Sequence, residues 1–175
     1  PEEGAKKPAS SRQRPVRLSE IAEEKRRRIP SGNAEFDRVL GGGIVPASMV
    51  LIGGDPGIGK STLLTEVAGH LSEEHKVLYV SAEESCAQIK MRCDRLGVKS
   101  DTLLVVNENC LENILEELNG VEFLIVDSIQ AVYLEGLSSS AGSVGQVREC
   151  ASRLMRAAKG MGVTVFIVGH VTKEG

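Results

Sequence analysis

The sequence predicts an α/β fold in which a mostly parallel sheet carries helices on both faces. Short, continuous apolar runs alternate with amphipathic stretches from residue 48 onward, and such runs are typical of strands buried on both faces. A glycine-rich loop follows the first apolar run directly, which is where a phosphate-binding loop lies in such folds. The chain has 175 residues, of which 41% are hydrophobic, enough for one domain with its own core.

Five strands and four helices are expected in alternation. The apolar runs that predict the strands are residues 48–53, 76–81, 102–106, 121–128 and 163–170. The stretches that predict the helices are residues 61–71, 84–98, 110–120 and 143–160. The first helix carries an apolar stripe of Leu63, Leu64, Val67, Ala68 and Leu71, and the second has a shared face of Cys86, Ile89, Cys93 and Leu96. Ligands bind such sheets at the carboxyl ends of the strands, so the polar residues there are the first candidates for a site.

The N-terminal part of the chain, residues 1–27, is predicted to be a linker with a flexible basic arm, ahead of a folded core over residues 28–175. Residues 1–19 are rich in Pro, Ser, Ala and charged residues and show no apolar period. Residues 1–30 carry nine Lys and Arg against five Asp and Glu, although the whole chain has a net charge of −3. A solvated arm and an arm that contacts phosphates both fit this composition.

The composition argues against three kinds of function. No apolar run reaches the roughly 18 residues that a membrane helix needs, so we expect no membrane partner and a cytoplasmic protein. The four cysteines form no CxxC pair, so we expect no zinc site within the chain and four buried thiols in a reducing compartment. Because only 3% of the residues are aromatic, a platform that stacks successive bases on rings is not expected either.

The glycine-rich loop "GDPGIGKS" is predicted to hold the phosphates of a nucleoside triphosphate. It matches the pattern G-x-x-x-x-G-K-[ST], and the expected strand before it and amphipathic helix after it are the context that the motif needs. Backbone N–H groups would point at phosphate oxygens, Lys60 would bridge the β- and γ-phosphates, and the Ser61 hydroxyl would ligate Mg²⁺. A glycine turn without a ligand is the alternative. The predicted nucleotide-binding residues are Gly54, Asp55, Pro56, Gly57, Ile58, Gly59, Lys60, Ser61 and Thr62.

Four further polar residues at strand ends are candidates for hydrolysis, which needs a second magnesium ligand and a group that orients the attacking water. Asp127 ends an apolar strand, the position of a Walker B carboxylate, although a helix cap or turn aspartate is the alternative. Glu83 and Glu84 follow another strand; we favour Glu83 as the base, with Glu84 as its partner or substitute. His170 ends the last strand, where it could touch the γ-phosphate or simply be solvated.

A Ser- and Gly-rich loop, residues 134–146, and the helix after it are the candidate contacts to a polymer. The loop should be mobile in isolation. The helix places Val147, Cys150, Ala151, Leu154 and Ala158 on one side. The loop serines and the basic residues on the other side of the helix are the DNA-binding candidates: Ser138, Ser139, Ser140, Arg148, Arg156 and Lys159. A solvent-facing helix beside a flexible loop would explain the same residues.

Taken together, four segments resemble the RecA-like ATPase domain of the RadA (Sms) family of bacterial DNA-repair proteins. They are "IPSGNAEFDRVLGGGIVPASMVLIGGDPGIGKSTLL", "YVSAEES", "FLIVDSIQ" and "FIVGHVTKEG", and the likeness runs from about residue 28 to residue 175. The stretches "LGGGIVPAS" and "GHVTKEG" are much more specific than the phosphate-binding loop itself. The resemblance implies a DNA-dependent ATPase with ATP and Mg²⁺ as cofactors. It also implies a homo-hexameric ring acting in recombinational repair in the bacterial cytosol, associated with the nucleoid.

The family pattern also assigns roles and partners. It implies that Lys60 is the essential lysine, Asp127 the Walker B acid, Glu83 the catalytic glutamate and His170 the sensor, with residues 134–146 as a DNA-contacting loop. The partners it implies are single-stranded or branched DNA, during branch migration and the processing of recombination intermediates, and the recombinase RecA. A RecA-like sheet order would place the strand over residues 163–169 between the phosphate-loop strand and the Asp127 strand.

The sequence also departs from the family pattern. It holds no four-cysteine zinc module, and it ends before the Lys- and Arg-bearing motif and the Lon-protease-like domain that the family has. We therefore expect a core that is incomplete on its C-terminal side, with the phosphate-loop strand as a bare edge. Because cationic groups that reach the γ-phosphate from a neighbouring subunit would be missing, we also expect slow hydrolysis by this chain.

Other classes fit parts of the pattern. A KaiC-like or replicative-helicase-like ATPase shares the fold and the paired glutamates. A small-molecule kinase shares the phosphate-binding loop, but no Arg-rich insertion that could form its lid is evident between the strands. A nucleotide-gated interaction module that assembles without rapid turnover is the third alternative, which a Glu83→Gln change would distinguish from a motor.

Overall fold

The structure, a computed structural model, describes residues 15–21 and 27–171. The strands are β1 (Met49–Gly54), β2 (Val77–Ser81), β3 (Leu103–Asn107), β4 (Phe123–Asp127) and β5 (Thr164–His170). The helices are α1 (Ala34–Val39), α2 (Lys60–Leu71), α3 (Cys86–Leu96), α4 (Leu111–Glu116) and α5 (Val144–Met161), with the 3-10 turns η1 (Leu18–Glu20) and η2 (Ile129–Ala131). All predicted strands and helices are therefore present. Most of the predicted linker lies outside the described residues.

The five strands form one parallel sheet in the order β1-β5-β4-β2-β3. The α/β, RecA-like fold class is thereby confirmed, and so is the expected position of β5 between β1 and β4. Within the described residues β1 lies at one edge of the sheet and β3 at the other. The order brings the carboxyl ends of β1, β5, β4 and β2 next to one another, which is where a ligand site is expected.

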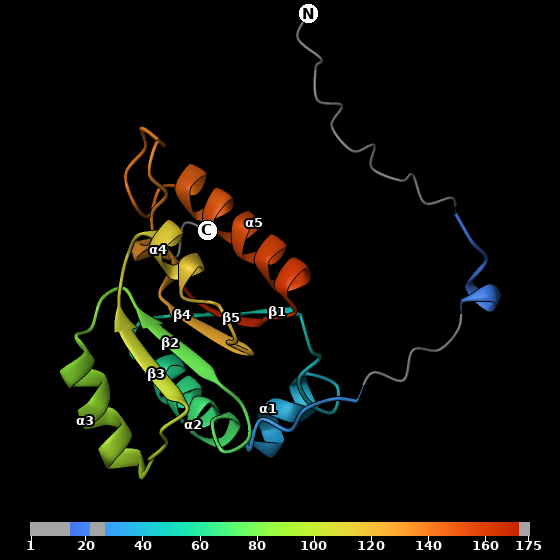
Figure 1. The fold of residues 1–175 in the computed structure, drawn as a ribbon, viewed down its shortest axis with the longest axis horizontal. Coiled ribbons are helices and arrows are strands. Elements are labelled where there is room, and N and C mark those ends of the chain that lie inside the picture. Colours follow the sequence, from blue (N-terminus) through green and yellow to red (C-terminus); the bar gives the residue numbers. More distant parts are fainter. Residues whose placement is uncertain (1–14, 22–26, 172–175) are drawn as a thin grey trace, which may run out of the picture.

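Helices cover both faces of the sheet (Figure 1). The helices α1, α2 and α3 lie below it in that view, and α4 and α5 lie above it. Along β4 the side chains alternate between the two layers, because Phe123 and Ile125 join the core under α2 whereas Leu124 and Val126 join the core under α5. None of the helices in the described ranges has the length and apolar character that a bilayer crossing requires.

Two details of the helices differ from the sequence prediction. The helix expected over residues 110–120 ends at Glu116, because the following N–H groups bond three residues back, Leu118 to Leu115 and Val121 to Leu118. Cys86, predicted to share the buried face of α3, is exposed at the first position of that helix. The prediction of a buried thiol is therefore wrong for Cys86 and confirmed for the other three cysteines.

Two glycines within helices, Gly69 in α2 and Gly160 in α5, allow a test of how α2 packs against Val98. A Cβ added at Gly69 would lie 2.7 and 2.8 Å from the two Cγ atoms of Val98, whereas a Cβ at Gly160 in α5 would meet nothing within 4 Å. Val98 is β-branched and cannot easily turn away, so we expect Gly69→Ala to lower the free energy of unfolding by about 1–3 kcal/mol. We expect Gly160→Ala to be neutral or to raise it by up to about 1 kcal/mol. Chemical denaturation measures both, and equal losses in the two variants would contradict this packing.

Candidate functional site

The polar residues at the strand ends converge on one region. The register pairs Gly54 with His170 and Ser81 with Asp127, so these residues stand side by side at the carboxyl edge of the sheet. A cavity of about 220 Å³ is lined by Pro56, Gly57, Ser61, Ser81, Glu83, Glu84, Asp127 and His170. A neighbouring cavity of about 170 Å³ is lined by Gly57, Gly59, Lys60, Ser61, Thr62 and His170. The structure thus brings together the predicted phosphate loop and all four predicted strand-end residues.

The phosphate loop has the backbone shape that its glycines permit. Gly57 and Gly59 have φ angles of +83° and +100°, in the left-handed region that residues with a Cβ rarely adopt. Helix α2 begins immediately afterwards, at Lys60, so the N–H groups of its first turn and its dipole face the loop. A helix N-terminus of this kind favours a bound anion.

Lys60 lies inside this loop. Its side chain is buried, and Nζ donates hydrogen bonds to the carbonyl oxygens of Gly54 and Asp55, each at 2.7 Å. The two carbonyls keep the ammonium beside the loop N–H groups instead of letting it extend into solvent. A phosphate that entered the loop would meet both the charge and the N–H donors.

Asp127 and Ser61 fit a magnesium site. Asp127 is buried, and its Oδ2 accepts a hydrogen bond of 2.7 Å from the Tyr79 hydroxyl, which leaves Oδ1 for a further ligand. The carboxylate and the Ser61 residue line the same cavity. Within the described part of the chain no group of three or more His, Cys, Asp or Glu could hold a metal. Magnesium, however, is commonly held by one or two protein oxygens together with phosphates and water.

The two adjacent glutamates have different surroundings. Glu84 accepts a charge-assisted hydrogen bond from Nη1 of Arg92. The Glu83 side chain is 51% exposed; its Oε1 accepts a hydrogen bond from Ser128 and lies 3.5 Å from Nε2 of His170. The Arg92 contact holds the Glu84 carboxylate in one position, whereas the Glu83 carboxylate contacts no guanidinium of the described residues and lies beside Ser128 and His170.

His170 is only partly exposed, with 29% of its side chain accessible. Its Nδ1 is buried and has no hydrogen-bond partner among the described residues. Its carbonyl oxygen accepts a hydrogen bond of 3.0 Å from Nε2 of Gln130, in the η2 turn after β4. The histidine is therefore packed at the edge of the cavity between Glu83 and η2, and not simply solvated.

The residues behind the carboxylates keep their ordinary charge states. Burial raises the pKa of the Tyr79 phenol, and the neighbouring Asp127 raises it further, so Tyr79 stays protonated and donates. For Arg92 burial acts to lower the pKa, but the net shift is upward because Tyr79, Glu84 and Asp127 all favour the charged guanidinium. The arrangement is thus a fixed donor chain that ends at anionic acceptors.

Sequence reasoning did not find Tyr79, Arg92, Thr65 or Ser128. One signal was available for Arg92: it follows Ile89 by three residues and immediately precedes Cys93, both of which are buried on α3. Helical periodicity therefore turns Arg92 toward the core, where a charge requires partners. The identity of those partners depends on the packing of α3 against α2 and β2, which the sequence does not specify.

The DNA-binding candidates lie apart from the cavity. Ser138, Ser139 and Ser140 are exposed on the loop after η2, and Arg148, Arg156 and Lys159 are exposed on α5. Arg156 donates to Glu149 at 3.3 Å, so the basic side of α5 also carries an acidic partner. The base of the loop is fixed by Gln146, which is 1% exposed and exchanges hydrogen bonds with the backbone of Leu134.

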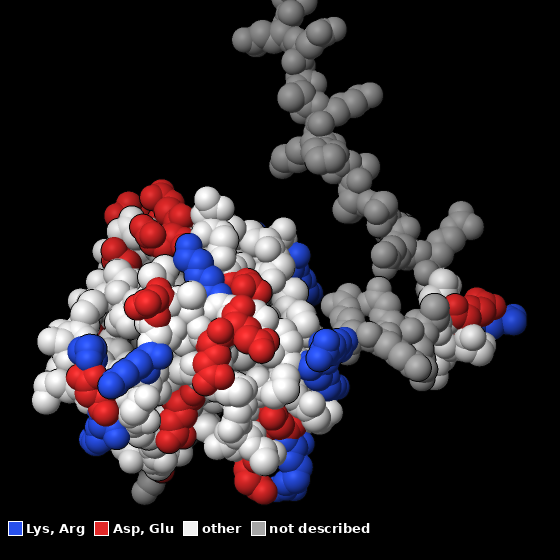
Figure 2. Space-filling model, turned by 60° about the horizontal axis from the view of Figure 1, so that its bottom comes forward, with Lys and Arg blue, Asp and Glu red and all other residues white. Residues whose placement is uncertain are grey.

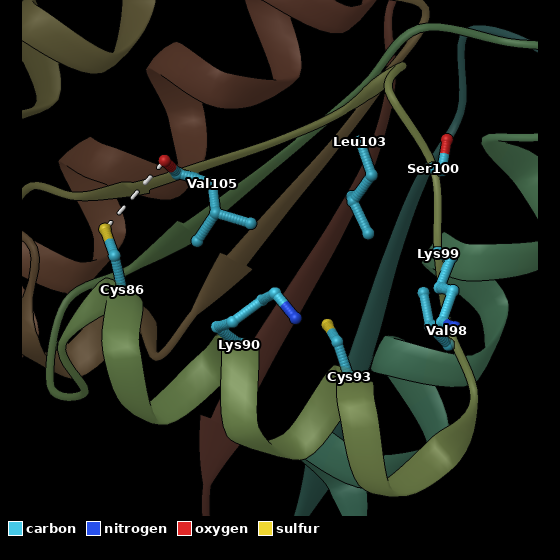
Figure 3. A pocket seen from close by; sticks show the side chains of 8 residues that line it. All are labelled: Cys86, Lys90, Cys93, Val98, Lys99, Ser100, Leu103 and Val105. Carbon is cyan, nitrogen blue, oxygen red and sulfur yellow. Dashed lines mark hydrogen bonds between the residues drawn. The ribbon is translucent and has the colours of Figure 1, made fainter.

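A larger hollow of about 330 Å³ lies elsewhere, between α3 and the edge strand β3 (Figure 3). Cys86, Lys90 and Cys93 line it from α3, and Leu103 and Val105 line it from β3. Its walls are mainly apolar side chains, and it includes none of the residues predicted to act on a nucleotide. The polar cavity at the strand ends is therefore the candidate active site, although it is smaller.

Comparison with known proteins shows the family to which the chain belongs. A family model described as an AAA domain matches residues 15–175. The DNA repair protein RadA of Listeria monocytogenes is 53% identical over 161 residues, which cover 90% of this chain and 35% of that protein. The RadA proteins of Bacillus subtilis and Campylobacter jejuni are each 51% identical, over 93% and 91% of this chain and 36% of each relative. The chain thus spans about a third of the length of the curated relatives that it matches.

Proposed function

The chain belongs to the AAA domain family and shares the RecA-like ATPase fold of the bacterial RadA proteins, and from this premise we propose that it is the ATP-binding and ATP-hydrolysing motor domain of a DNA-repair protein. One observation carries the proposal. Lys60, Asp127 and Glu83 come from three separate parts of the chain and line two neighbouring cavities at the carboxyl edge of the sheet, which share Gly57, Ser61 and His170. Lys60 is a phosphate-binding cation, Asp127 a metal-binding carboxylate and Glu83 an accessible base.

The roles of the residues follow from their positions. The loop N–H groups and Lys60 hold the β- and γ-phosphates, and Ser61 and Asp127 hold Mg²⁺, which when bound would neutralise charge on the phosphate oxygens. Glu83 orients a water molecule and takes its proton. The water oxygen forms a bond to the γ-phosphorus as the bond from that phosphorus to the bridging oxygen breaks. His170, which lies beside Glu83, would sense whether the γ-phosphate is present.

The alternatives of other classes have less support. The similarity to RadA over about 90% of the chain favours a DNA-repair ATPase over a KaiC-like or replicative-helicase-like one. A small-molecule kinase would have an acceptor pocket and a basic lid next to the phosphates, whereas the described residues that line the cavity are mainly acidic and small. An assembly module without turnover would not need an accessible carboxylate, such as that of Glu83, beside the phosphate loop.

We propose single-stranded or branched DNA as the polymer that this domain acts on, through the loop after η2 and the basic residues along α5. The loop offers exposed hydroxyl and N–H groups, and Arg148 follows it on α5. Figure 2 shows the face that carries α1, α2 and α3, where acidic and basic side chains are interspersed. A hexameric ring, branch migration and work alongside RecA in the bacterial cytosol remain part of the same proposal, because the resemblance implies them.

A DNA-stimulated ATPase assay tests this proposal. We expect single-stranded DNA to raise the rate of ATP hydrolysis, and we expect Arg148→Ala combined with Lys159→Ala to reduce that stimulation while basal hydrolysis stays unchanged. The salt dependence of DNA binding should fall by about one unit of slope for each phosphate contact that is lost. Arg95→Ala, an exposed arginine on the opposite side of the sheet, is the matched control. A wild-type chain that neither binds single-stranded DNA nor hydrolyses ATP faster in its presence would contradict the choice of polymer.

A further inference from the structure

Arg92 is a buried cation at the centre of a hydrogen-bond network behind the candidate active site. Its side chain is 9% exposed, and its guanidinium donates to the Thr65 hydroxyl at 2.9 Å through Nε and to the Tyr79 hydroxyl at 3.2 Å through Nη2. Nη1 donates to Glu84. One side chain on α3 thereby contacts α2, β2 and the loop after β2.

The two hydroxyl groups extend this network to both residues predicted to hold magnesium, to the side chain of Asp127 and to the main chain of Ser61. Tyr79 donates to Oδ2 of Asp127 at 2.7 Å, and Thr65 donates to the carbonyl oxygen of Ser61 at 2.7 Å. A guanidinium has only donors, so each hydroxyl must accept from Arg92 and can use its proton only toward the next acceptor. The direction of both chains is therefore fixed, from Arg92 through a hydroxyl to a residue that would hold the metal.

We propose that Arg92 is a positioning residue for the magnesium site, an inference that rests on the proposed function. Through Tyr79 it fixes one oxygen of Asp127 and leaves the other for the metal, and through Thr65 it fixes the turn of α2 that carries Ser61. Groups behind metal ligands commonly set metal affinity by orienting those ligands. The same guanidinium also binds the Glu84 carboxylate. We therefore assign the role of base to Glu83 and not to Glu84.

A positioning role and a purely structural role for Arg92 predict different effects on the magnesium requirement. A buried ion pair that only supported the fold would affect stability when it was removed, and would leave the magnesium requirement of the remaining folded protein unchanged. A positioning role predicts a change in the magnesium requirement even in a variant that is as stable as the wild type. Tyr79→Phe is suited to this test because it removes one oxygen and keeps the buried ring.

The experiment measures binding of a fluorescent ATP analogue as a function of Mg²⁺ concentration, with thermal melting of each variant and an EDTA titration as the metal-free reference. We expect Tyr79→Phe and Arg92→Met to raise the Mg²⁺ concentration at half-saturation by about 10-fold or more, with metal-free nucleotide affinity unchanged. Arg92→Lys, which keeps the charge but loses the planar fork, should give an intermediate value. Arg95→Met, an exposed arginine on the same helix, should behave as the wild type.

Two outcomes would overturn the inference, and they are distinguishable. If Tyr79→Phe and folded Arg92→Met both bind Mg²⁺ with the nucleotide within twofold of the wild type, Arg92 has only a structural role and the proposed function stands. If the wild type itself shows nucleotide binding that does not respond to Mg²⁺, the magnesium site in the proposed function fails, and this inference fails with it.

Discussion

Replacing Glu83 by glutamine is expected to slow ATP hydrolysis by about 10²–10⁴-fold, the contribution of a positioned general base, while Mg²⁺–ATP binding is retained. The amide keeps the shape of the side chain and can still accept from Ser128, but it cannot take a proton from water. Single-turnover hydrolysis and equilibrium nucleotide binding, measured on the same preparation, separate the two effects. Because the Glu83→Gln variant would bind ATP without hydrolysing it, it should also remain in any oligomer that ATP binding promotes.

Glu84→Gln is the matched control for this prediction. The carboxylate of Glu84 is occupied by Arg92, and glutamine can still accept that hydrogen bond, so we expect the rate to fall by no more than about 10-fold, in the range of a group behind the site. The two variants remove the same charge from neighbouring positions. If Glu84→Gln proved the more damaging of the two, the assignment of the base would be wrong.

Replacing Lys60 by alanine is expected to have the largest effect on binding. The ammonium lies within the phosphate loop, on the carbonyls of Gly54 and Asp55. A charged hydrogen-bond partner contributes about 1.5–3 kcal/mol, so Lys60→Ala should weaken ATP binding by about 10–150-fold. Hydrolysis should fall by a further factor of about 10²–10³, because one electrostatic contact to the developing charge is lost. Isothermal titration and steady-state hydrolysis measure the two effects.

The control for Lys60→Ala is Lys99→Ala, an exposed lysine beside the hollow between α3 and β3. It removes the same charge at a distance from the phosphate loop, so nucleotide binding should match the wild type. Thermal melting shows whether each variant is folded. If Lys60→Ala were folded and bound ATP as tightly as Lys99→Ala does, the loop would not be the nucleotide site.

Much of the fold was predictable from the sequence because the signals were local. Each strand is a short apolar run bounded by polar residues or glycine, and the structure places each strand within a few residues of its prediction. The order of the strands came from the resemblance and is confirmed. The end of the helix near Gly120 was not predictable in the same way, because the change to three-residue turns after Glu116 leaves the apolar pattern intact.

The residues of the candidate site could be predicted from the sequence. The different roles of Glu83 and Glu84 could not. Glu83 and Glu84 are adjacent in sequence, and local pattern gives no means of separating them. The difference arises from Arg92, which reaches Glu84 only because α3 packs against α2 and β2. Cys86 was misplaced for a related reason: it shares the helical face of Ile89, but the hollow between α3 and β3 leaves its end of the helix uncovered.

A crystal structure of the chain bound to Mg²⁺ and a non-hydrolysable ATP analogue tests the proposed active site most directly. We expect the phosphates in the loop over residues 54–62, with Nζ of Lys60 moved from the carbonyls of Gly54 and Asp55 onto phosphate oxygens. We expect Mg²⁺ beside Ser61 and Asp127, and a water molecule between Glu83 and the γ-phosphate. A nucleotide bound elsewhere, or phosphates in the loop with Glu84 in place of Glu83 beside that water, would contradict the assignment.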